Sequence, residues 1–173
     1  MGDFWVFGYG SLIWRPGFAH VETRRAHLHG YRRSLCVYSF VHRGTRQRPG
    51  LVLGLDHGGS CVGLAFRVPG ELRDEVNAYL RERELVTSVY LERTLKVRLE
   101  GGGKVEAVAY IVDRKHEQYA GALDAAHAAA VVRGAVGQSG NNEDYVLSTL
   151  KHLEALGIRD HWLEDVARGI APS

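Results

Sequence analysis

Long apolar runs and cysteines are scarce in this sequence. No apolar run reaches the ~20 residues that a membrane-spanning helix needs. The two cysteines, Cys36 and Cys61, are too few for a disulfide framework and favour a reducing compartment. The first residues do not resemble a signal peptide, because Asp3 replaces a basic residue and Gly8 and Gly10 interrupt the apolar stretch. We therefore expect a cytoplasmic protein without a membrane partner.

Most motifs of nucleotide binding, metal binding and hydrolysis are also missing. The sequence has no Walker loop, GxGxxG or CxxC, and His116-Glu117 is not followed by the second histidine of HExxH. His27 and His29 would share one face of a strand, but two ligands without a third are better explained as exposed polar residues. Ser11 lacks the following glycine that the nucleophile elbow of a hydrolase requires. The sequence therefore predicts neither a metal nor a cofactor.

Length and composition are those of an ordinary globular domain. The 173 residues are 45% hydrophobic and 24% charged, which suits a single domain over residues 1–173 with a sizeable core. The net charge of +2 is unevenly distributed: residues 1–50 hold eight arginines and two acidic residues, a net of +6, which leaves −4 for residues 51–173. Such a basic segment binds nucleic acid or a small acidic substrate, or is simply a solvated strand face.

Nucleic-acid binding is one hypothesis that the basic segment raises. It would combine the N-terminal arginines with aromatic stacking platforms, for which the candidates are Trp5, Tyr9, Trp14 and Tyr31. The negative charge of the remaining chain and the apolar neighbours of these aromatic residues argue against it. We therefore expect a small-molecule substrate and no nucleic-acid partner, while the sequence leaves the oligomeric state open.

The first half of the chain has the pattern of β-strands. An apolar run predicts a buried strand over residues 3–9, and loose alternation predicts one long or two short strands over residues 27–40. Two further apolar runs, 51–55 and 61–68, are separated by Asp-His-Gly-Gly-Ser at residues 56–60. Glycine pairs of this kind are typical of hairpin turns, so we expect a hairpin there.

After residue 70 the sequence predicts helices and one further hairpin. Residues 71–84 carry apolar side chains at helical spacing, and a hairpin joins strands 88–99 and 104–112. The remainder of the chain has a helical pattern, with Gly137 and Gly157 as predicted helix ends. Segregated strands and helices with interleaved hairpins predict an α+β fold, with a curled mixed sheet or β-barrel and flanking helices.

The stretch FGYGSL ends the first predicted strand in an unusual way. Gly8 and Gly10 bracket Tyr9 directly after an apolar run, and Ser11 precedes a second apolar run. Glycine weakens the interior of a strand and marks either a bend or a close approach of the backbone. The stretch is therefore either a simple exit from the core or a loop that presents its backbone amides to a ligand.

Glu84 is the carboxylate with the most informative position. It follows Leu80 by one helical turn, at the flank of the apolar stripe, whereas Asp74 and Arg81 fall on the polar face of the predicted helix. We expect the Glu84 carboxylate to be partly buried, and burial raises the pKa of a carboxyl group. An ordinary charged helix end is the alternative interpretation.

Five segments, in order, resemble the ChaC-type γ-glutamylcyclotransferase family and together span almost the whole chain. FGYGSLIW at residues 7–14 looks like the signature of that family. YLRERE at residues 79–84 resembles the helix end that carries its catalytic glutamate. The other three are HRGT and RPG within residues 42–50, GLAFRVP at residues 63–69, and AVGQSGNNEDY at residues 135–145.

The resemblance implies a γ-glutamylcyclotransferase-like fold and a lyase reaction. In that family, glutathione is cleaved to 5-oxoproline and cysteinylglycine in the cytoplasm, without a cofactor. The resemblance assigns proton transfer to Glu84 and implies that Tyr119 and Tyr145 belong to the substrate pocket. It places the γ-glutamyl group on the loop of Gly8, Tyr9, Gly10, Ser11, Leu12 and Ile13. One departure is Gln138, which replaces the usual proline of a GPSG element and would loosen that loop.

Two alternative functions fit the same residues. Other γ-glutamyl peptides and γ-glutamyl amines carry the group that the loop would hold, so the breadth of the substrate stays open. A protein that binds γ-glutamyl groups without cleaving them is the second alternative. The presence of a glutamate at position 84 argues against such a silent protein.

Overall fold

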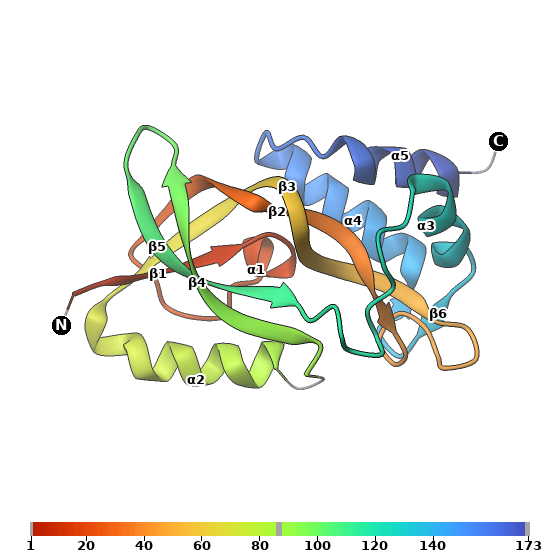
Figure 1. Ribbon diagram of the computed structural model, residues 1–173, viewed down its shortest axis with the longest axis horizontal. Helices are drawn as coiled ribbons and strands as arrows, with labels where there is room; N and C mark the ends of the chain where they lie inside the picture. Colours follow the sequence, from red (N-terminus) through yellow and green to blue (C-terminus); the bar gives the residue numbers. More distant parts are fainter. Residues whose placement is uncertain (1, 86–87, 172–173) are drawn as a thin grey trace. The chain divides into compact units, whose positions relative to one another are not determined.

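The computed structural model describes residues 2–85 and 88–171 (Figure 1). Within these ranges, no helix combines the length and apolar character that crossing a membrane requires. The strands are β1 (Phe4–Gly8), β2 (Glu22–Ser39), β3 (Gly50–Val68), β4 (Tyr90–Leu99), β5 (Lys104–Val112), β6 (Val136–Gly137) and β7 (Gly140–Asn141). The helices are α1 (Ser11–Trp14), the 3₁₀ turn η1 (Gly70–Leu72), α2 (Arg73–Glu84), α3 (Ala125–Val132), α4 (Asn142–Ala155) and α5 (His161–Ile170).

Five strands close into a barrel in the order β1-β3-β2-β4-β5. The sheet is mixed, because β1 pairs antiparallel with β3 and parallel with β5. Closure gives each of these strands two neighbours, with short seams of two residue pairs each between β1 and β5 and between β2 and β4. The predicted α+β fold with a mixed barrel and flanking helices is confirmed, and residues 27–40 fall almost entirely within the single long strand β2.

The hairpin predicted at residues 56–60 is wrong, because β3 runs without interruption from Gly50 to Val68. The side chain of Asp56 is fully buried and pairs with the Arg32 guanidinium of β2 at 3.2 Å. Gly58 and Gly59 have positive φ values of 98° and 72°, a conformation that glycine adopts at no steric cost. The glycines therefore distort the strand locally, while the ion pair between the buried Asp56 and the half-buried Arg32 holds it beside β2.

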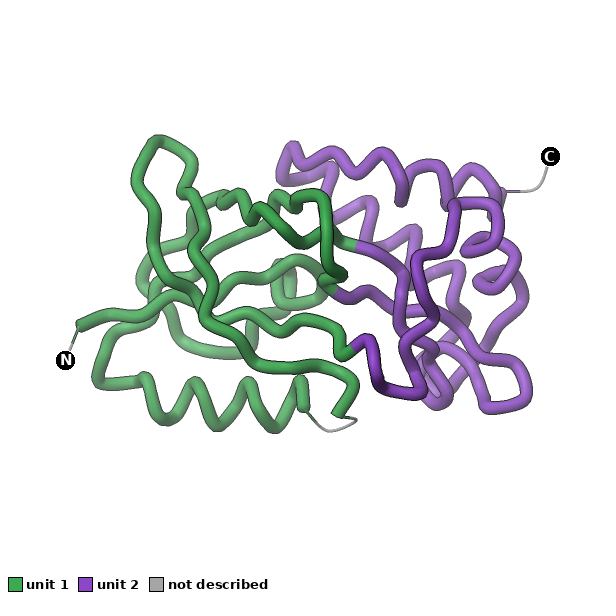
Figure 2. Tube along the Cα trace, in the orientation of Figure 1, with its two compact units in different colours: residues 1–33, 55–113 green, residues 34–54, 114–173 purple. Residues whose placement is uncertain are grey.

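The chain divides into two compact units (Figure 2). The first contains the described residues of 1–33 and 55–113, and the second contains those of 34–54 and 114–173. The boundaries fall inside β2 and β3, so each of these strands contributes residues to both units. Each unit has a buried apolar interior, with Val6 and Leu80 in the first and Leu153 and Leu163 in the second.

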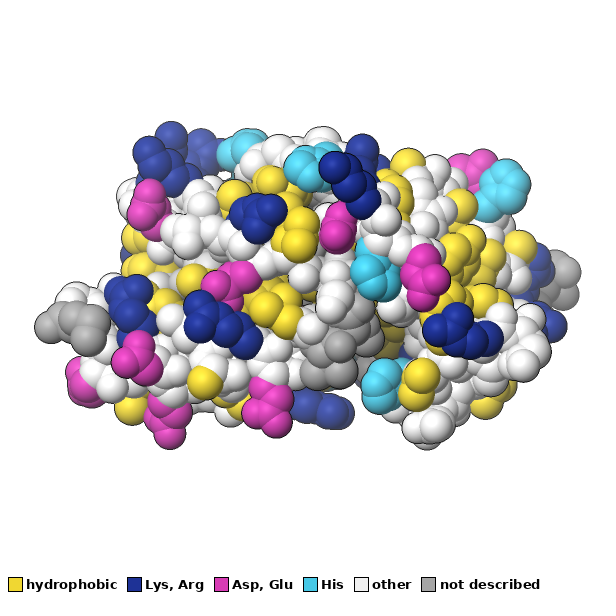
Figure 3. Space-filling model, turned by 60° about the horizontal axis from the view of Figure 1, so that its bottom comes forward, with side chains coloured by type: hydrophobic (Ala, Val, Ile, Leu, Met, Phe, Trp, Pro, Cys, Tyr) yellow, Lys and Arg dark blue, Asp and Glu magenta, His cyan; other side chains and the backbone are white. Residues whose placement is uncertain are grey.

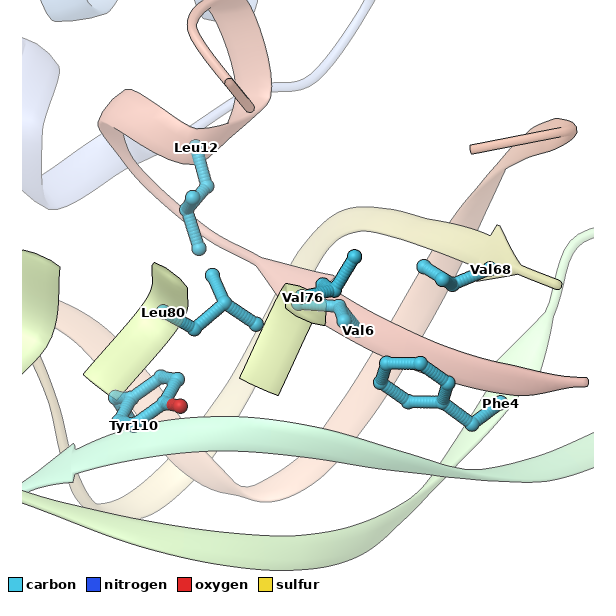
Figure 4. Packing of buried hydrophobic residues seen from close by; sticks show 7 residues of the cluster. All are labelled: Phe4, Val6, Leu12, Val68, Val76, Leu80 and Tyr110. Carbon is cyan, nitrogen blue, oxygen red and sulfur yellow. The ribbon is translucent and has the colours of Figure 1, made fainter. Parts of the chain in front are cut away.

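The interior of the first unit fixes α1 and α2 against β1. Alternate residues of a strand point to the same side, so Phe4 and Val6 of β1 both face the apolar stripe of α2. Figure 4 shows Leu12 pointing from α1 toward Leu80 of α2. Burying an aliphatic side chain of this size contributes about 1.5–3 kcal/mol to stability. The other members of this cluster are Val68, Val76 and Tyr110.

Local sequence sets the ends of the helices in the second unit. Gly157 ends α4 as predicted: with φ of 70°, its amide bonds Glu154 O and the next amide bonds Leu153 O. The helix end predicted at Gly137 is wrong, because α3 already stops at Val132 and Gly137 lies in β6. A Cβ at Gly137 would lie 2.5 Å from the His42 carbonyl carbon, so glycine permits a close backbone approach there.

Candidate active site

The FGYGSL stretch, residues 7–12, forms the end of β1, the short loop after it and the start of α1. A Cβ at Gly8 would lie 3.0 Å from Leu12 Cβ and 3.4 Å from the Phe66 ring. Gly63 of β3 is equally constrained, because its Cβ would overlap the Gly8 carbonyl oxygen. Glycine at position 8 therefore lets the loop fold closely onto β3, which is a packing reason for part of the motif.

Gly10 caps the N-terminus of α1. Its carbonyl accepts a hydrogen bond from the Ile13 amide at 2.9 Å, and Ser11 O accepts one from Arg15 N at 2.8 Å. The Ile13 amide is engaged in this way, whereas the amides of Ser11 and Leu12 precede the first hydrogen bond of the helix. The backbone that follows Gly10 therefore supplies donors of the kind that bind a carboxylate or an oxyanion.

A buried arginine holds the loop from the other side. Arg33 is 6% exposed, and its Nε donates to the Tyr9 carbonyl at 2.6 Å while Nη2 donates to the Val62 carbonyl at 2.7 Å. Charge-assisted hydrogen bonds of this kind are stronger than neutral ones. The sequence suggested Arg33 as part of a basic surface; instead it is an internal support of the FGYGSL loop.

Glu84 is the last residue of α2, one turn after the fully buried Leu80. Its side chain is 16% exposed, as expected for a position at the flank of the apolar stripe. Burial raises the pKa of the Glu84 carboxyl, and the positive charge of Arg83 lowers it by a smaller amount. Glu82, two residues earlier, is exposed. The predicted burial and raised pKa of Glu84 are confirmed.

Arg83 connects the end of α2 with the loop. Its Nε lies 3.7 Å from the Glu84 Oε1 atom. The other guanidinium nitrogens donate to Arg15 O (2.5 Å), Pro16 O (3.1 Å), Tyr79 Oη (3.0 Å) and Ser11 Oγ (3.0 Å). The structure thus brings two sequence-predicted site residues, Ser11 and Glu84, to the same guanidinium.

A second carboxylate, Glu92, belongs to a hydrogen-bonded network on β4 and β5. Arg81 donates to both of its oxygens at 3.0 and 3.1 Å, and Tyr110 Oη donates to one at 2.9 Å. The Arg81 contact lowers the pKa of Glu92, whereas burial and the charges of Glu92 and Glu84 raise the pKa of Tyr110. The environment therefore shifts the pKa values of the Glu84 and Glu92 carboxyl groups in opposite directions.

Tyr119 and Tyr145 both belong to the second unit. The Tyr145 hydroxyl accepts a hydrogen bond from the Leu53 amide at 3.0 Å, and Arg43 lies over its ring. Tyr119 is half-buried and forms an isolated bridge with Val37. The first unit by itself brings the loop and Glu84 together, and the two tyrosines are placed among residues of the second unit.

The segments that resemble the ChaC-type family sort into the same two units. Residues 63–69 and 79–84 lie in the first unit with the FGYGSL loop, and residues 42–50 and 135–145 lie in the second. There His42 Nδ1 is 3.0 Å from Ser139 Oγ. Gln138 donates its backbone amide to Val41 O at 2.7 Å, a bond that proline cannot make. This hydrogen bond restrains the loop, which the absence of the proline was expected to loosen.

Metal ligands do not gather in the described part of the chain, where no group of three or more His, Cys, Asp or Glu side chains could hold an ion. The His27 and His29 rings lie 4.1 Å apart, and Arg98 Nη2 is 3.5 Å from His29 Nε2. Burial, followed by the charges of His29 and Arg98, lowers the pKa of His27. The guanidinium beside His29 makes this pair a poor cation site.

Known proteins match the chain over nearly its whole length. The family described as ChaC-like protein matches residues 4–171. A glutathione-specific γ-glutamylcyclotransferase of Escherichia coli is 34% identical over 165 residues, covering 95% of this chain and 71% of that protein. Glutathione-specific γ-glutamylcyclotransferase 1 of Homo sapiens is 33% identical over 157 residues, covering 88% and 71%. The crystal structure of a yeast γ-glutamyl cyclotransferase specific to glutathione has the same fold, with a TM-score of 0.85 and 23% identity over 98% of this chain and 96% of that one.

Proposed function

Because the chain belongs to the ChaC-like protein family, we propose that it is a glutathione-specific γ-glutamylcyclotransferase. In this reaction the α-amine of the glutamyl residue attacks its own γ-amide carbon. A carbon–nitrogen bond forms and closes a five-membered lactam, and the bond to the cysteine nitrogen breaks. The products are 5-oxoproline and cysteinylglycine, which leaves with a proton on its new amine.

The FGYGSL loop is proposed to hold the γ-glutamyl group. An intramolecular attack gains most when the protein holds the γ-glutamyl group of the substrate folded, with its α-amine close to its γ-amide carbon. The amides of Ser11 and Leu12, which precede the first hydrogen bond of α1, are suited to binding the substrate carboxylate or the developing oxyanion. Arg33 holds the backbone of this loop through the Tyr9 carbonyl, and Arg83 holds the Ser11 side chain through its hydroxyl.

Glu84 is proposed to carry the proton from the attacking amine to the leaving amine. An ordinary glutamate titrates near ~4.3 and an α-amine near ~8, a mismatch of about 5 kcal/mol. Burial raises the pKa of Glu84 and thereby narrows this gap. The raised pKa at the end of α2, beside the loop contact of Arg83, is the observation that carries the assignment.

The decisive experiment incubates the protein with glutathione and detects 5-oxoproline and cysteinylglycine by mass spectrometry. Glu84→Gln keeps the shape of the side chain but cannot carry a proton, so we expect turnover to fall by at least about 10²-fold. Binding of the γ-glutamyl group should largely survive. Glu82→Gln, on the exposed face of the same helix, is the matched control and should keep its turnover.

Each alternative function predicts a different result in the same assay. Near-normal turnover of a folded Glu84→Gln protein would remove Glu84 from the mechanism. Binding of glutathione without products would identify a silent γ-glutamyl-binding protein, and faster turnover of other γ-glutamyl amides would broaden the substrate. We further propose that residues 1–173 act as one domain in the cytoplasm, which suits the two cysteines, Cys36 and Cys61, that are not joined in a disulfide.

A further inference from the structure

We propose that Arg83 is a positioning residue, which ties the substrate loop to the end of α2 so that Ser11 and Glu84 keep a fixed separation. The inference rests on the proposed function, since it concerns the same loop and the same carboxylate. It adds a residue whose part in the reaction is indirect, because Arg83 acts through the loop and through Glu84.

The contacts of Arg83 join three separate parts of the first unit. One terminal nitrogen donates to the carbonyls of Arg15 and Pro16, just after α1, and to the Tyr79 hydroxyl one turn earlier on α2. The other terminal nitrogen donates to the Ser11 hydroxyl at the start of α1. The guanidinium therefore forms hydrogen bonds with residues at both ends of α1.

The apolar contacts between α1 and α2 cannot by themselves fix the separation of Ser11 and Glu84. Leu12 and Leu80 belong to one core cluster, but apolar packing is non-directional and tolerates small shifts. A planar guanidinium with five donors in a fixed fork sets both distance and angle. The Arg83 side chain is also only 20% exposed, and its bonds to Pro16 and Tyr79 are partly buried.

Arg81 shows that the role is specific to one arginine. It lies on the same helix end, is 56% exposed, and directs its guanidinium to Glu92 of β4. The Arg81 guanidinium bonds the strand, whereas the Arg83 guanidinium bonds the Ser11 hydroxyl and the Tyr79 hydroxyl of α2. Arg81 is therefore a matched control for the loss of a guanidinium at this end of α2.

Arg83 also acts on the charge of Glu84. The guanidinium Nε lies 3.7 Å from Glu84 Oε1 and lowers the pKa of that carboxyl, against the larger effect of burial. As a general base, Glu84 must be ionised, so the acid limb of the kcat/KM profile follows its pKa. Removing the positive charge should move this limb to higher pH, whereas a lysine should leave it in place.

The test compares Arg83→Lys, Arg83→Gln and Arg81→Lys as purified proteins. Lysine keeps the charge but lacks the fork, so Arg83→Lys should lose about 10²-fold in kcat, with a smaller rise in KM and an unchanged acid limb. Arg83→Gln should show the same loss together with an acid limb shifted to higher pH. Arg81→Lys should stay within about twofold of the parent protein.

A second variant covers the case in which Arg83 variants fold poorly. Ser11 is exposed, so Ser11→Ala should fold normally and lose roughly tenfold in kcat through the tether alone. Combined with Arg83→Lys, it should add much less than tenfold, because both changes break the same contact. Independent losses that multiply would contradict a shared tether.

Hydrogen exchange separates this inference from the proposed reaction. In the Arg83→Lys protein, the backbone amides of residues 8–14 should exchange with solvent at least about tenfold faster than in the parent protein. The measurement is made well below the melting temperature, where the amides of the strands should stay protected. Parent-like kcat/KM and exchange in Arg83→Lys would overturn the inference. If the parent protein does not cleave glutathione, the proposed function fails, and exchange of residues 8–14 alone then decides for or against the tether.

Discussion

At the scale of single residues, Glu84 is placed where its charge is unfavourable. It closes α2 next to a fully buried leucine, and its side chain is largely shielded from water. A carboxyl group in such a place is ionised only at the expense of folding stability, because the unfolded chain solvates the charge fully. Stability given up at a reactive group is a common property of active sites.

Replacing Glu84 by glutamine should therefore stabilise the protein near neutral pH. The folded-state pKa of Glu84 is raised, so its ionisation destabilises the fold increasingly as pH rises from the unfolded pKa, near ~4.3, through the folded pKa. Glutamine lacks this effect. Thermal denaturation should show a higher Tm for Glu84→Gln at pH 7–8, and the difference should vanish toward pH 4.

Parent and variant melting alike at every pH between 4 and 8 would contradict the burial of the charge. Glu82→Gln provides the reference, because the exposed side chain of Glu82 should give no pH-dependent difference. Each kcal/mol corresponds to about 2–4 °C in a chain of this length.

Gly10 tests whether the FGYGSL loop does more than turn the chain. If the loop is only a bend, Gly10→Ala should change activity no more than its effect on stability explains. If the backbone holds the substrate, the added methyl group should obstruct the ligand or redirect the amides. We expect kcat/KM for glutathione to fall by about 10²-fold with a much smaller change in Tm.

The two quantities should be measured on one preparation of the Gly10→Ala protein. A protein that melts several degrees lower yet keeps full kcat/KM would leave the loop as a structural bend. Gly8 is unsuitable for this comparison, because a Cβ there would lie 3.0 Å from Leu12 Cβ.

The sequence predicts some of these residues and misses others for physical reasons. The partial burial of Glu84 follows from helical periodicity, since it lies one turn after Leu80. Arg33 is missed because its acceptors, the carbonyls of Tyr9 and Val62, are distant in sequence and become neighbours only when β1, β2 and β3 pair. An arginine that satisfies internal carbonyls has no local sequence signal that distinguishes it from a solvated one.

At the scale of elements, α4 supports the part of β3 that belongs to the same unit. The Asn142 side chain accepts from the Leu51 amide at 2.7 Å and donates to the Leu51 carbonyl at 2.8 Å. One turn later, the Tyr145 hydroxyl accepts from Leu53. Two side chains of the helix thus bond alternate residues of the strand as a neighbouring strand would, which accounts for two residues of the AVGQSGNNEDY segment.

Asn142→Ala should consequently lower the free energy of unfolding strongly. Asn142 is fully buried, and its removal leaves an amide and a carbonyl of Leu51 without these hydrogen bonds. Each unsatisfied buried group costs about 1–3 kcal/mol, so we expect a loss of about 2–4 kcal/mol in urea denaturation. Ser148→Ala, exposed on the same helix, should change stability by less than about 0.5 kcal/mol. A loss below about 1 kcal/mol for Asn142→Ala would refute this role.

The wrong hairpin in β3 shows where a local signal fails. Asp-His-Gly-Gly-Ser has the composition of a turn, and the pattern was interpreted within a window of a few residues. The pairing of the buried Asp56 carboxylate with Arg32 of β2 outweighs that preference. The barrel class was predictable, because it depends on many apolar runs together, whereas the continuity of one strand depends on one distant partner.

At the scale of the whole molecule, the basic N-terminal segment is largely used internally. Every arginine from position 24 to 48 contacts an acceptor within its own unit, such as Asp56 for Arg32 and the Asn141 carbonyl for Arg43. Figure 3 shows basic and acidic side chains interspersed on the face in view. Arginines engaged in this way are poorly suited to forming a continuous track for phosphates.

We therefore predict that the protein binds neither duplex nor single-stranded nucleic acid tightly at physiological salt. Fluorescence anisotropy over a series of salt concentrations is the measurement. Submicromolar affinity that falls steeply with added salt would support the nucleic-acid hypothesis instead, because counterion release makes that dependence unavoidable.

The parallel pairing of β1 with β5 has a consequence for the order in which the protein forms. It joins residues 5 and 6 to residues 107 and 108, so the N-terminal strand cannot take its final place on the ribosome before Val108 has emerged. Pairings between distant positions form slowly, because a long loop must close before any contact compensates for the lost chain entropy. Glu84 lies inside that loop. The nascent chain therefore already contains both the FGYGSL loop and Glu84 when β1 first becomes able to pair with β5.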